Sequence, residues 1–415
     1  MRILWVSNMM PGALRQVLGN PPGWGLWMDH VLSGIRQKDV TLRLLCPGQG
    51  AGTLEDGLEY ALFREEKAYE YSIDLENWFR DQLADFRPDV IHIWGTEYGH
   101  TLAAVQAAGK LGLGQRVVIS IQGLVGIYAG HMLEGLPYRV CRGNTLRNLL
   151  RRDNLLRQQR DFEIRGRMER RALELAPHVM GRTQWDKAIT QQYHPGIHYH
   201  FCNETLREEF YQGAWQYDQC QKHRIFASSC VYPVKGFHYL LEAFTIVLDR
   251  YPDATLTVAG DSFFAPTIKE KLRQQYYFRE LERFCREKGL TERIEFLGPL
   301  DARQMKQAYL ESNVFALPST IENSPNSLGE AMLLGVPCVA ADVGGVRDLL
   351  HPGEGFVYQS TAPYMLAHYI MEVFRLRQDA QQMGALASAH ARRTHDPEKN
   401  LEALLTAYRE IAGKE

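Results

Sequence analysis

Short apolar segments of strand length alternate along the chain with longer segments in which apolar residues recur at helical spacing. Parallel sheets whose strands are joined by crossover helices have this alternation, because both faces of each strand are buried. The alternation begins twice, so the sequence predicts an α/β protein with two doubly wound units. The apolar segments are 2–8, 40–46, 89–95, 116–123 and 178–183 in the first series, and 223–229, 254–261, 293–299, 314–319, 337–342 and 355–359 in the second.

The length of the chain, 415 residues, also exceeds what one hydrophobic core usually supports. Between the two series lies an irregular, polar stretch that we interpret as a linker, and Asp396-Pro397 is a typical helix start. We therefore expect four parts. They are an N-terminal domain over 1–200, a linker over 201–222, a C-terminal domain over 223–395, and a final helix over 396–415 that packs back on the N-terminal domain.

Composition and charge are those of a globular protein without a strong overall field. The chain is 45% hydrophobic and 23% charged, with a formal net charge of -2, so its overall charge does not predict binding to nucleic acid. Its seven cysteines are scattered without a C-x-x-C pair, which is typical of reduced thiols in a cytosolic protein. The N-terminal apolar run is shorter than a signal peptide needs, and no segment approaches the roughly 20 apolar residues of a membrane span. We expect a cytoplasmic protein.

One segment departs from this neutral background. Residues 138–171 contain eleven arginines and four acidic residues, with leucine and valine at helical spacing. One interpretation is a long solvated helix whose arginine stems cover the domain surface. The other is a basic amphipathic helix that makes peripheral contact with anionic lipid at the inner face of the membrane. Both interpretations remain open from the sequence.

The most informative polar residues follow the apolar segment 314–319. In a doubly wound sheet, ligands bind beyond the carboxyl ends of the strands, and the next loop, which carries Glu322, is in such a position. Glu330 follows eight residues later, inside the next predicted helix. The N-terminus of that helix suits a phosphate, and Glu330 can accept from the vicinal hydroxyls of a ribose. Taken alone, the pair favours a plainer interpretation, in which Glu330 complements the helix dipole and Glu322 is a solvated loop acid.

The surrounding motifs change this interpretation. The sequence resembles the retaining glycosyltransferases of the GT-B fold (glycosyltransferase family 4, group 1 type), most clearly over residues 225–360. The spacing of Glu322 and Glu330 matches the E-x7-E motif of that family and is followed by AMLLGVPCVAADVGG in the family's style. YPVKGFHYLLEAF resembles its lysine–glycine loop, and FLGPLDARQMKQAYLESNVFALPS resembles its strand, glycine and helix upstream. The resemblance implies two Rossmann-like domains that face each other across a donor-binding cleft.

The resemblance also implies roles for single residues. Lys235 is similar to the lysine that contacts the donor diphosphate, Glu330 would hold the ribose, and Glu322 would lie beside the transferred sugar. The remaining donor-side candidates are Asn323, Ser324, Asn326 and Ser327, which would wrap the sugar and phosphates, and Gly298, which would lie near the base.

The N-terminal half is expected to supply the acceptor side. PPGWGLWMDHV, after the first predicted strand, resembles the family's glycine-rich loop, where close approach of a phosphate or the acceptor requires a missing side chain. Gly23 and Gly25 are the candidates for that position, and the sequence does not decide between them.

Two positions depart from the family pattern. Cys230 stands where members often carry an arginine near the diphosphate, and Arg182 is the candidate that would replace it. Gln122 stands where a histidine often lies near the transferred sugar. The amide of Gln122 forms hydrogen bonds but cannot become a cation or move a proton. His131 would compensate if its loop folds back.

The expected chemistry follows from the leaving group. Cleavage of a sugar–diphosphate bond leaves negative charge on the β-phosphate, which needs cations or hydrogen-bond donors placed there. The chain has no D-x-D motif, so Lys235 and a helix N-terminus would neutralise that charge, and we expect no metal requirement. The predicted function is a retaining hexosyltransferase that uses a UDP- or GDP-linked sugar and a glycan or lipid-linked acceptor, in polysaccharide or glycoconjugate biosynthesis. Two alternatives remain: a nucleotide-sugar epimerase of the same fold, and a catalytically impaired nucleotide-sugar-binding partner protein.

Overall fold

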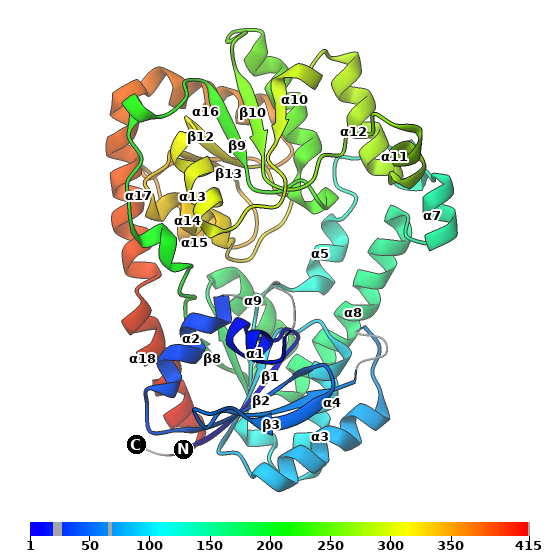
Figure 1. Ribbon diagram of the computed structural model, residues 1–415, viewed down its shortest axis with the longest axis vertical. Coiled ribbons are helices and arrows are strands. Elements are labelled where there is room, and N and C mark those ends of the chain that lie inside the picture. Colours follow the sequence, from blue (N-terminus) through cyan, green and yellow to red (C-terminus); the bar gives the residue numbers. More distant parts are fainter. Residues whose placement is uncertain (20–26, 65–68, 414–415) are drawn as a thin grey trace. The chain divides into compact units, whose positions relative to one another are not determined.

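The computed structural model of the chain describes residues 1–19, 27–64 and 69–413. The chain forms two compact units, each built around a sheet of its own (Figure 1). The predicted fold class, a pair of Rossmann-like α/β domains, is therefore confirmed. Unit 1 comprises residues 1–127, 161–205 and 395–415, and unit 2 comprises residues 128–160 and 206–394.

Unit 1 contains an eight-stranded sheet in the order β3-β4-β2-β1-β5-β6-β7-β8. Neighbouring strands are parallel except for β3 and β4, which form an antiparallel pair at one edge. In the centre, Ile3 of β1 lies opposite Leu42 of β2 on one side and Val90 of β5 on the other. The strands are β1 (Arg2–Ser7), β2 (Thr41–Pro47), β3 (Gly50–Thr53), β4 (Glu59–Phe63), β5 (Val90–Trp94), β6 (Val117–Ser120), β7 (His178–Gly181) and β8 (His198–Phe201).

Helices connect these strands as crossovers, and two of them are shared with the other unit. The helices that lie wholly in unit 1 are α1 (Gly12–Val17), α2 (Trp27–Arg36), α3 (Ile73–Phe86), α4 (Gly99–Lys110), α9 (Gln184–Tyr193) and α18 (Pro397–Ile411). The helices α5 (Val125–His131) and α8 (Leu155–Leu175) each have one end in unit 1 and the other end in unit 2.

Unit 2 contains a six-stranded sheet in which every neighbouring pair is parallel, in the order β11-β10-β9-β12-β13-β14. Its strands are β9 (Arg224–Ala227), β10 (Thr255–Val258), β11 (Ile294–Phe296), β12 (Val314–Leu317), β13 (Cys338–Ala341) and β14 (Phe356–Tyr358). Its helices are α6 (Tyr138–Arg142), α7 (Leu146–Arg151), α10 (Phe237–Leu248), α11 (Ile268–Arg273), α12 (Tyr276–Glu287), α13 (Ala302–Glu311), α14 (Asn326–Leu333), α15 (Val346–Leu349), α16 (Pro363–Leu376) and α17 (Ala380–Thr394).

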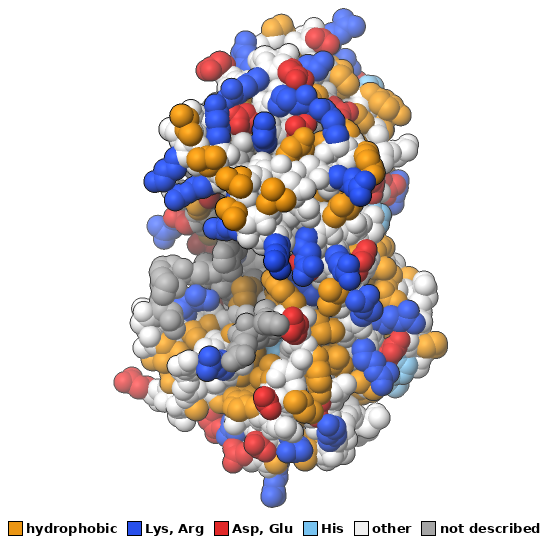
Figure 2. Space-filling model, turned by 90° about the vertical axis from the view of Figure 1, so that its right-hand side faces the viewer, with side chains coloured by type: hydrophobic (Ala, Val, Ile, Leu, Met, Phe, Trp, Pro, Cys, Tyr) orange, Lys and Arg blue, Asp and Glu red, His pale blue; other side chains and the backbone are white. Residues whose placement is uncertain are grey.

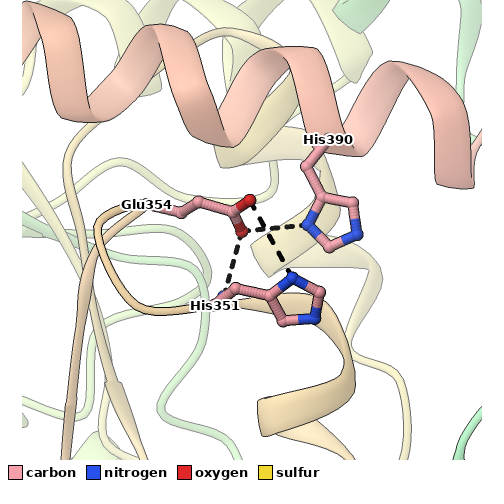
Figure 3. A group of neighbouring side chains, drawn as sticks. All are labelled: His351, Glu354 and His390. Atoms are coloured by element: carbon pink, nitrogen blue, oxygen red, sulfur yellow. Dashed lines mark hydrogen bonds and ion pairs between the residues drawn. The ribbon is translucent and has the colours of Figure 1, made fainter.

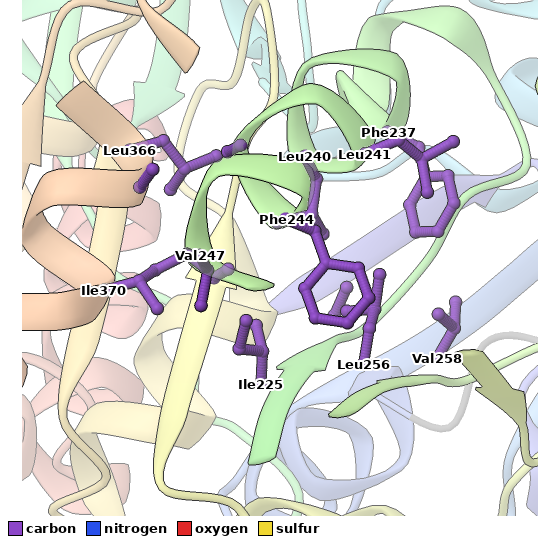
Figure 4. Close-up of a cluster of buried hydrophobic side chains, with 14 of the residues drawn as sticks. Ile225, Phe237, Leu240, Leu241, Phe244, Val247, Leu256, Val258, Leu366 and Ile370 are labelled. Atoms are coloured by element: carbon purple, nitrogen blue, oxygen red, sulfur yellow. The ribbon is translucent and has the colours of Figure 1, made fainter. Parts of the chain in front are cut away.

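The core of unit 2 shows why the second series of segments folds as it does. One face of α10 packs on β9 and β10 and is flanked by α16 (Figure 4). Its buried apolar residues recur at helical spacing and so form one face against the sheet and α16. Each buried side chain stabilises the fold by about 1.5–3 kcal/mol. The buried side chains are Phe237, Leu240, Leu241, Phe244 and Val247 of α10, Ile225, Leu256 and Val258 of the sheet, and Leu366 and Ile370 of α16.

The sequence predicted eleven strands, and each expected segment contains one in the structure. The short strands β3, β4 and β8 were missed. β3 reads Gly-Ala-Gly-Thr and β8 reads His-Tyr-His-Phe, and neither has the apolar run by which the other strands were found. Both strands lie at the edges of the sheet, where one side has no neighbour and an apolar sequence is not required.

The division into units differs from the expected ranges in two respects. Residues 206–222 are not a linker, because Phe210 and Trp215 are buried in the core of unit 2. Residues 128–160, expected in the N-terminal domain, also belong to unit 2. The basic segment 138–171 is correspondingly not one helix but comprises α6, α7 and most of α8. Among the described residues, no helix is both long and apolar enough to cross a membrane.

The C-terminal helix α18 belongs to unit 1 and completes its core. The hydroxyl of Tyr408 accepts a hydrogen bond from Trp5 Nε1 at 2.9 Å and lies within hydrogen-bond distance of His92 Nδ1. The other ring nitrogen of His92 lies 2.6 Å from Ser120 Oγ. Complete burial lowers the pKa of His92 to about 3, so the ring is neutral at pH 7. The neutral ring accepts from Tyr408 and donates to Ser120, which joins α18 to three strands of the sheet.

This network yields a stability prediction. In Tyr408→Phe, the buried N–H of Trp5 and the Nδ1 of His92 lose their partner, which we expect to lower the free energy of unfolding by about 1–3 kcal/mol. Thermal and urea unfolding followed by circular dichroism measure this change. Tyr364→Phe is the matched control, because the side chain of Tyr364 is 62% exposed. Equal stability of the two variants would mean that the network contributes nothing.

Candidate functional site

In unit 2, the loops that follow β9 and β12 meet at the carboxyl ends of the strands. The first loop ends in a 3₁₀ turn (Pro233–Lys235) followed by Gly236, which begins α10. The second runs from Pro318 to Pro325 and begins α14. The backbone N–H of Thr320 donates to Val234 O at 2.9 Å and so joins the two loops. This is where a doubly wound sheet places its ligands.

Two glycines make this meeting possible. Gly236 has φ +63°, and a Cβ there would lie 1.8 Å from the carbonyl oxygen of Pro318. Gly344, which follows β13, has φ +51°, and a Cβ there would lie 1.7 Å from the carbonyl oxygen of Glu322. Any side chain at either position would push the backbones apart. The loop of Glu322 is therefore held from two sides, by Gly236 of the lysine–glycine pair and by Gly344 after β13.

Lys235 and Glu322 form an ion pair in this site. The Nζ of Lys235 lies 2.6 Å from Oε1 of Glu322, and the hydroxyl of Ser319 donates to the same oxygen at 2.8 Å. Glu322 is buried, whereas 35% of the Lys235 side chain is exposed. The carboxylate is thus not a solvated loop acid. It is held by the cation that the resemblance assigns to the diphosphate.

Glu330 is buried one turn into α14 and is bound by Arg207. The Nε and Nη2 of Arg207 lie 2.9 Å and 2.7 Å from Oε1 of Glu330. Burial raises the pKa of Glu330 to about 7, although the positive charge of Arg207 acts in the opposite direction. Both contacts go to Oε1, and Oε2 receives no hydrogen bond from any described residue. That oxygen is where hydroxyl groups of a ligand would be accepted.

The N-terminus of α14 lies in the same loop and has no side-chain cap. Its first residue, Asn326, has a buried Oδ1 without a hydrogen-bond partner among the described residues. Ser324 and Ser327 are half-buried beside it, and Asn323 is buried. The carbonyl oxygen of Ser327 accepts from Tyr309, which fixes the start of the helix. The uncapped N–H groups are therefore positioned for an anion.

Two further donor-side positions are defined by the structure. Gly298 follows β11 with φ +71°, and its carbonyl oxygen accepts from Gly260 N–H at 2.8 Å, so backbone groups line the end of β10 and β11. Cys230, in place of the family's arginine, is buried, and burial raises the pKa of its thiol to about 12. A neutral thiol therefore stands where the resemblance leads us to expect an arginine in many members of the family.

Gln122 lies in unit 1, in the loop after β6. Its Oε1 accepts from Nη2 of Arg182 at 3.4 Å, and Nη1 of Arg182 lies 2.5 Å from Oε2 of Glu204. The guanidinium of Arg182 is thus buried and engaged within unit 1. These three side chains line a pocket of unit 1 together with His30 and Trp94. Of the expected glycine-rich loop, Gly23 and Gly25 lie outside the described residues.

Glu169 of α8 supports the loop of Gln122 and was not predicted from the sequence. It is completely buried and accepts from the N–H groups of Val125 and Gly126, both at 3.0 Å, at the start of α5. Gly166 permits this contact, since a Cβ there would lie 2.3 Å from Gly126 Cα. Burial raises the pKa of Glu169 to about 7.

One hydroxyl connects Glu169 to the loop of Gln122. Thr96 Oγ1 lies 2.5 Å from Glu169 Oε2 and 3.0 Å from the carbonyl oxygen of Gly123. A single hydroxyl proton cannot serve both acceptors. When Glu169 is protonated it donates to Thr96, which then donates to Gly123, so protonation satisfies both contacts.

His131, the candidate that would compensate for Gln122, lies in unit 2. Its carbonyl oxygen accepts from Thr320 Oγ1 at 3.3 Å, and its Nδ1 lies 2.7 Å from Oε2 of Glu134. The structure thus brings the backbone of His131 to the loop of Glu322, although the two are far apart in sequence.

Comparison with solved structures shows which fold the chain has. Over 99% of both chains, the structure resembles the sucrose-phosphate synthase from Thermosynechococcus elongatus with a TM-score of 0.70 and 15% identity. It resembles Anabaena HepE in complex with UDP-glucose with a TM-score of 0.66 and 16% identity, over 99% of this chain and all of that one. These likenesses show that the chain has the GT-B fold.

The sequence comparisons relate one part of the chain to a family. Residues 220–390, less than half of the chain, match the model of the family described as glycosyl transferases group 1. D-inositol 3-phosphate glycosyltransferase of Corynebacterium diphtheriae is 32% identical over 161 residues, which is 38% of this chain and 35% of that protein. A GDP-mannose-dependent monoacylated alpha-(1-6)-phosphatidylinositol monomannoside mannosyltransferase of Corynebacterium glutamicum is 24% identical over 173 residues, 40% of this chain and 42% of that protein. The matches thus span less than half of these relatives.

The buried Glu169 yields a prediction on pH. Its pKa in the folded protein, about 7, is above the 4.5 of an unperturbed carboxyl, so between these values the folded state binds the proton more tightly. Stability contributed by Glu169 therefore falls as the pH rises from about 4.5 to about 7. We expect the melting temperature of Glu169→Gln to fall less steeply over this range than that of the wild type.

The matched control is Glu163→Gln, which changes an exposed glutamate of the same helix. Glu330 titrates in the same range, so part of the wild-type slope persists in Glu169→Gln. Melting temperatures measured in buffers from about pH 5 to pH 8 give the slopes. A Glu169→Gln slope equal to that of the wild type would exclude titration of Glu169.

Proposed function

We propose that the protein is a retaining, metal-independent hexosyltransferase that moves a sugar from a nucleotide diphosphate to a glycan or lipid-linked acceptor. The observation that carries this proposal is the convergence in unit 2 of Lys235, Glu322 and the uncapped N-terminus of α14 at the carboxyl ends of the strands. The group 1 family match covers all three elements.

The charges at this site fit departure of a nucleoside diphosphate. Negative charge develops on the β-phosphate as the sugar bond breaks, and a preorganised cation and N–H donors stabilise it. Lys235 is exposed enough to exchange part of its contact with Glu322 for a phosphate oxygen. The N-terminus of α14 supplies further donors. With these groups in place, the reaction needs no metal ion.

The two glutamates hold the hydroxylated parts of the donor. In the proposal, Oε2 of Glu330 accepts from the ribose while Arg207 keeps its charge balanced. Glu322 lies beside the transferred hexose, and the acceptor attacks from the face that the phosphate leaves, which retains the anomeric configuration. The acceptor side is assigned to the pocket of unit 1 that Gln122 and Arg182 line.

The names of the relatives support a nucleotide-sugar donor. HepE is described in complex with UDP-glucose, and the mannosyltransferase relative is named as GDP-mannose-dependent. We therefore keep UDP- and GDP-linked hexoses as the donor candidates, and polysaccharide or glycoconjugate biosynthesis as the setting.

Titration with UDP-, GDP-, ADP- and TDP-sugars, each with and without EDTA, identifies the donor. A donor at 100 times its Kd adds about 2.7 kcal/mol to the stability of the folded protein, which a thermal shift detects. Incubation of that donor with the protein in the absence of acceptor then tests for an epimerase, since only an epimerase changes the sugar. Binding without turnover on any acceptor would favour the impaired partner protein.

Lys235→Ala tests the role of the cation with the donor so identified. If Lys235 acts on the leaving group, kcat falls about 10²–10³-fold while the donor Kd changes much less. Transfer assays and donor titrations measure the two effects. Lys288→Ala, which changes an exposed lysine after α12, is the control. Losses of equal size in kcat and in affinity would restrict Lys235 to binding.

A surface of unit 2 supports the part of the proposal that concerns a lipid-linked acceptor. Two polar side chains at the start of α7 point inward: Oγ1 of the N-cap residue Thr145 donates to Gln274 O at 3.0 Å, and Asn148 Oδ1 accepts from Tyr276 N–H at 2.9 Å. Its leucines point outward. Leu149 and Leu150 are 62% and 76% exposed. This arrangement is the reverse of a helix that packs on its own domain.

The neighbouring helix α11 continues this surface. It lies against α7 and exposes Ile268 and Leu272, by 79% and 58%. Both helices lie on the side of the molecule that faces the viewer in Figure 2, where apolar side chains lie among lysines and arginines. We call these exposed residues the α7–α11 surface. Its apolar members are Leu146, Leu149, Leu150, Ile268 and Leu272, and its basic members are Arg151, Arg152, Lys269, Lys271 and Arg273.

Anionic lipid is the partner that this surface fits. Exposed leucines enter the headgroup region while the basic side chains around them meet lipid phosphates and carboxylates. In the proposal, the protein is cytoplasmic and touches the inner face of the membrane through the α7–α11 surface. The arginines of α8 contribute less, because several pair with acids, as Arg165 does with Glu97 at 2.5 Å.

Vesicle binding tests this surface. The double variant Arg151→Gln/Arg152→Gln loses about 2 kcal/mol of attraction, so we expect roughly 30-fold weaker binding to vesicles that contain phosphatidylserine. Leu149→Ser/Leu150→Ser should also weaken binding, and Leu386→Ser, an exposed leucine of α17, should not. Sedimentation with vesicles of phosphatidylserine or of phosphatidylcholine alone provides the measurement. Two results would remove the lipid contact from the proposal. One is wild-type binding of equal strength to both kinds of vesicle, and the other is binding by the α7 variants as strong as that of the wild type.

A further inference from the structure

Two histidines and a glutamate of unit 2 converge outside the donor site. His351 and Glu354 lie in the turn between α15 and β14, and His390 lies on α17. One ligand atom from each of the three lies within 4.8 Å of the other two. The Nδ1 of His390 is 2.9 Å from Oε2 of Glu354, and the Nδ1 of His351 is 4.0 Å from Oε1. Figure 3 shows both rings and the carboxylate pointing toward one another.

The turn that carries two of these side chains is rigidly built. The backbone N–H of His351 donates to Oε2 of Glu354 at 3.0 Å, and the N–H of Glu354 donates to the carbonyl oxygen of His351 at 3.1 Å. Gly353 has φ +88°, which favours glycine, and a Cβ on Gly355 would lie 2.8 Å from Cys338 O. The turn therefore presents His351 and Glu354 on the side of α17 before any ligand binds.

We propose that His351, Glu354 and His390 bind a divalent transition-metal ion, with Zn²⁺ the best fit. Imidazole nitrogen and carboxylate oxygen are ligands that Zn²⁺ accepts, and bond lengths of about 2.0–2.1 Å in a tetrahedron place neighbouring ligand atoms about 3.3 Å apart. The distances of 2.9 and 4.0 Å run to the two oxygens of Glu354, and the three ligand atoms lie within 4.8 Å of one another, so shifts of about 1.5 Å or less close the site. Half of the His351 side chain is exposed, which leaves an entry path and a fourth position for water.

The ion would act on structure and not on the transferred sugar. It would connect the turn of His351 to α17, and α17 already supports α14. Ser388 of α17 donates to Leu333 O of α14 at 2.8 Å, and a Cβ on Gly384 would lie 2.0 Å from Gly335 O. Metal binding therefore stabilises the layer that carries Glu330, while the proposed metal-free chemistry at Lys235 is unaffected.

A second histidine group in unit 1 serves as the internal comparison. His178 of β7 and His200 of β8 lie with Nδ1 and Nε2 3.1 Å apart. Burial and the neighbouring histidines lower the pKa of His178 to about 4, and burial also lowers the pKa of His200. The carboxylate of Glu410 lies 3.4 Å from Nδ1 of His200, whereas it is Nε2 of that ring that faces His178. Among the described residues, only His351, Glu354 and His390 bring three ligand atoms together.

Calorimetric titration with zinc chloride tests the assignment on protein first treated with EDTA and then freed of it. We expect one Zn²⁺ per chain and a raised melting temperature, without nucleotide present. His351→Ala and Glu354→Gln should each weaken zinc binding at least tenfold. His351→Ala changes a half-exposed side chain, and Glu354→Gln keeps the size of its residue, so both are expected to fold. The control is His178→Gln/His200→Gln, which should bind zinc like the wild type.

Several results would overturn this proposal. They are no zinc binding by the wild type, equal binding by His351→Ala and Glu354→Gln, and loss of binding in the His178→Gln/His200→Gln control. Binding of Co²⁺ gives an independent readout, because its visible absorption reports nitrogen and oxygen ligands in a tetrahedral site, and this absorption should disappear in Glu354→Gln. Neither experiment depends on the donor, so each can fail while the proposed transferase function stands.

Discussion

The candidate donor site depends on the close approach of two backbones, Gly236 against the carbonyl oxygen of Pro318. With a Cβ at Gly236 only 1.8 Å from that oxygen, no other residue permits this spacing. The approach carries Lys235 to within 2.6 Å of Glu322 and lets Thr320 bond to the loop of Val234. The position of the cation is thus set by the shape of the backbone. The charge pair forms because the glycine has already brought the loops together.

The sequence predicted the parts of the fold in which each element buries a continuous apolar face. Central strands such as β5, and the face of α10 that carries Phe244, follow from periodicity alone, because nothing else explains such patterns. The sequence did not predict segments whose place in the fold leaves no periodic apolar pattern. The edge strand β8 alternates polar residues, and the buried Trp215 lies in a stretch with no regular period. Their places are decided by tertiary contacts that leave no local signal.

The same distinction holds for the site. Lys235, Glu322 and the start of α14 were predicted because their motifs are contiguous in sequence. Arg207 was missed, since it lies 123 residues before its partner Glu330 in a stretch without helix or strand periodicity. Glu169 was missed because, in a segment rich in arginine, an acid suggests a surface pair. It is buried in the structure, where Gly166 lets α8 approach Gly126 closely.

Both glutamates of the E-x7-E spacing are already neutralised by cations of unit 2, Glu322 by Lys235 and Glu330 by Arg207. A buried carboxylate without a partner would be protonated or would destabilise the fold, so these cations are required before any ligand arrives. A polyhydroxylated ligand then has to compete only for oxygens that the cations leave open. A phosphate, by contrast, competes for Lys235 itself. The ion pairs therefore stabilise the site before a ligand binds. They also distinguish the two ends of a nucleotide sugar. Its hydroxyls add hydrogen bonds to the existing contacts, whereas its diphosphate must replace the contact between Lys235 and Glu322.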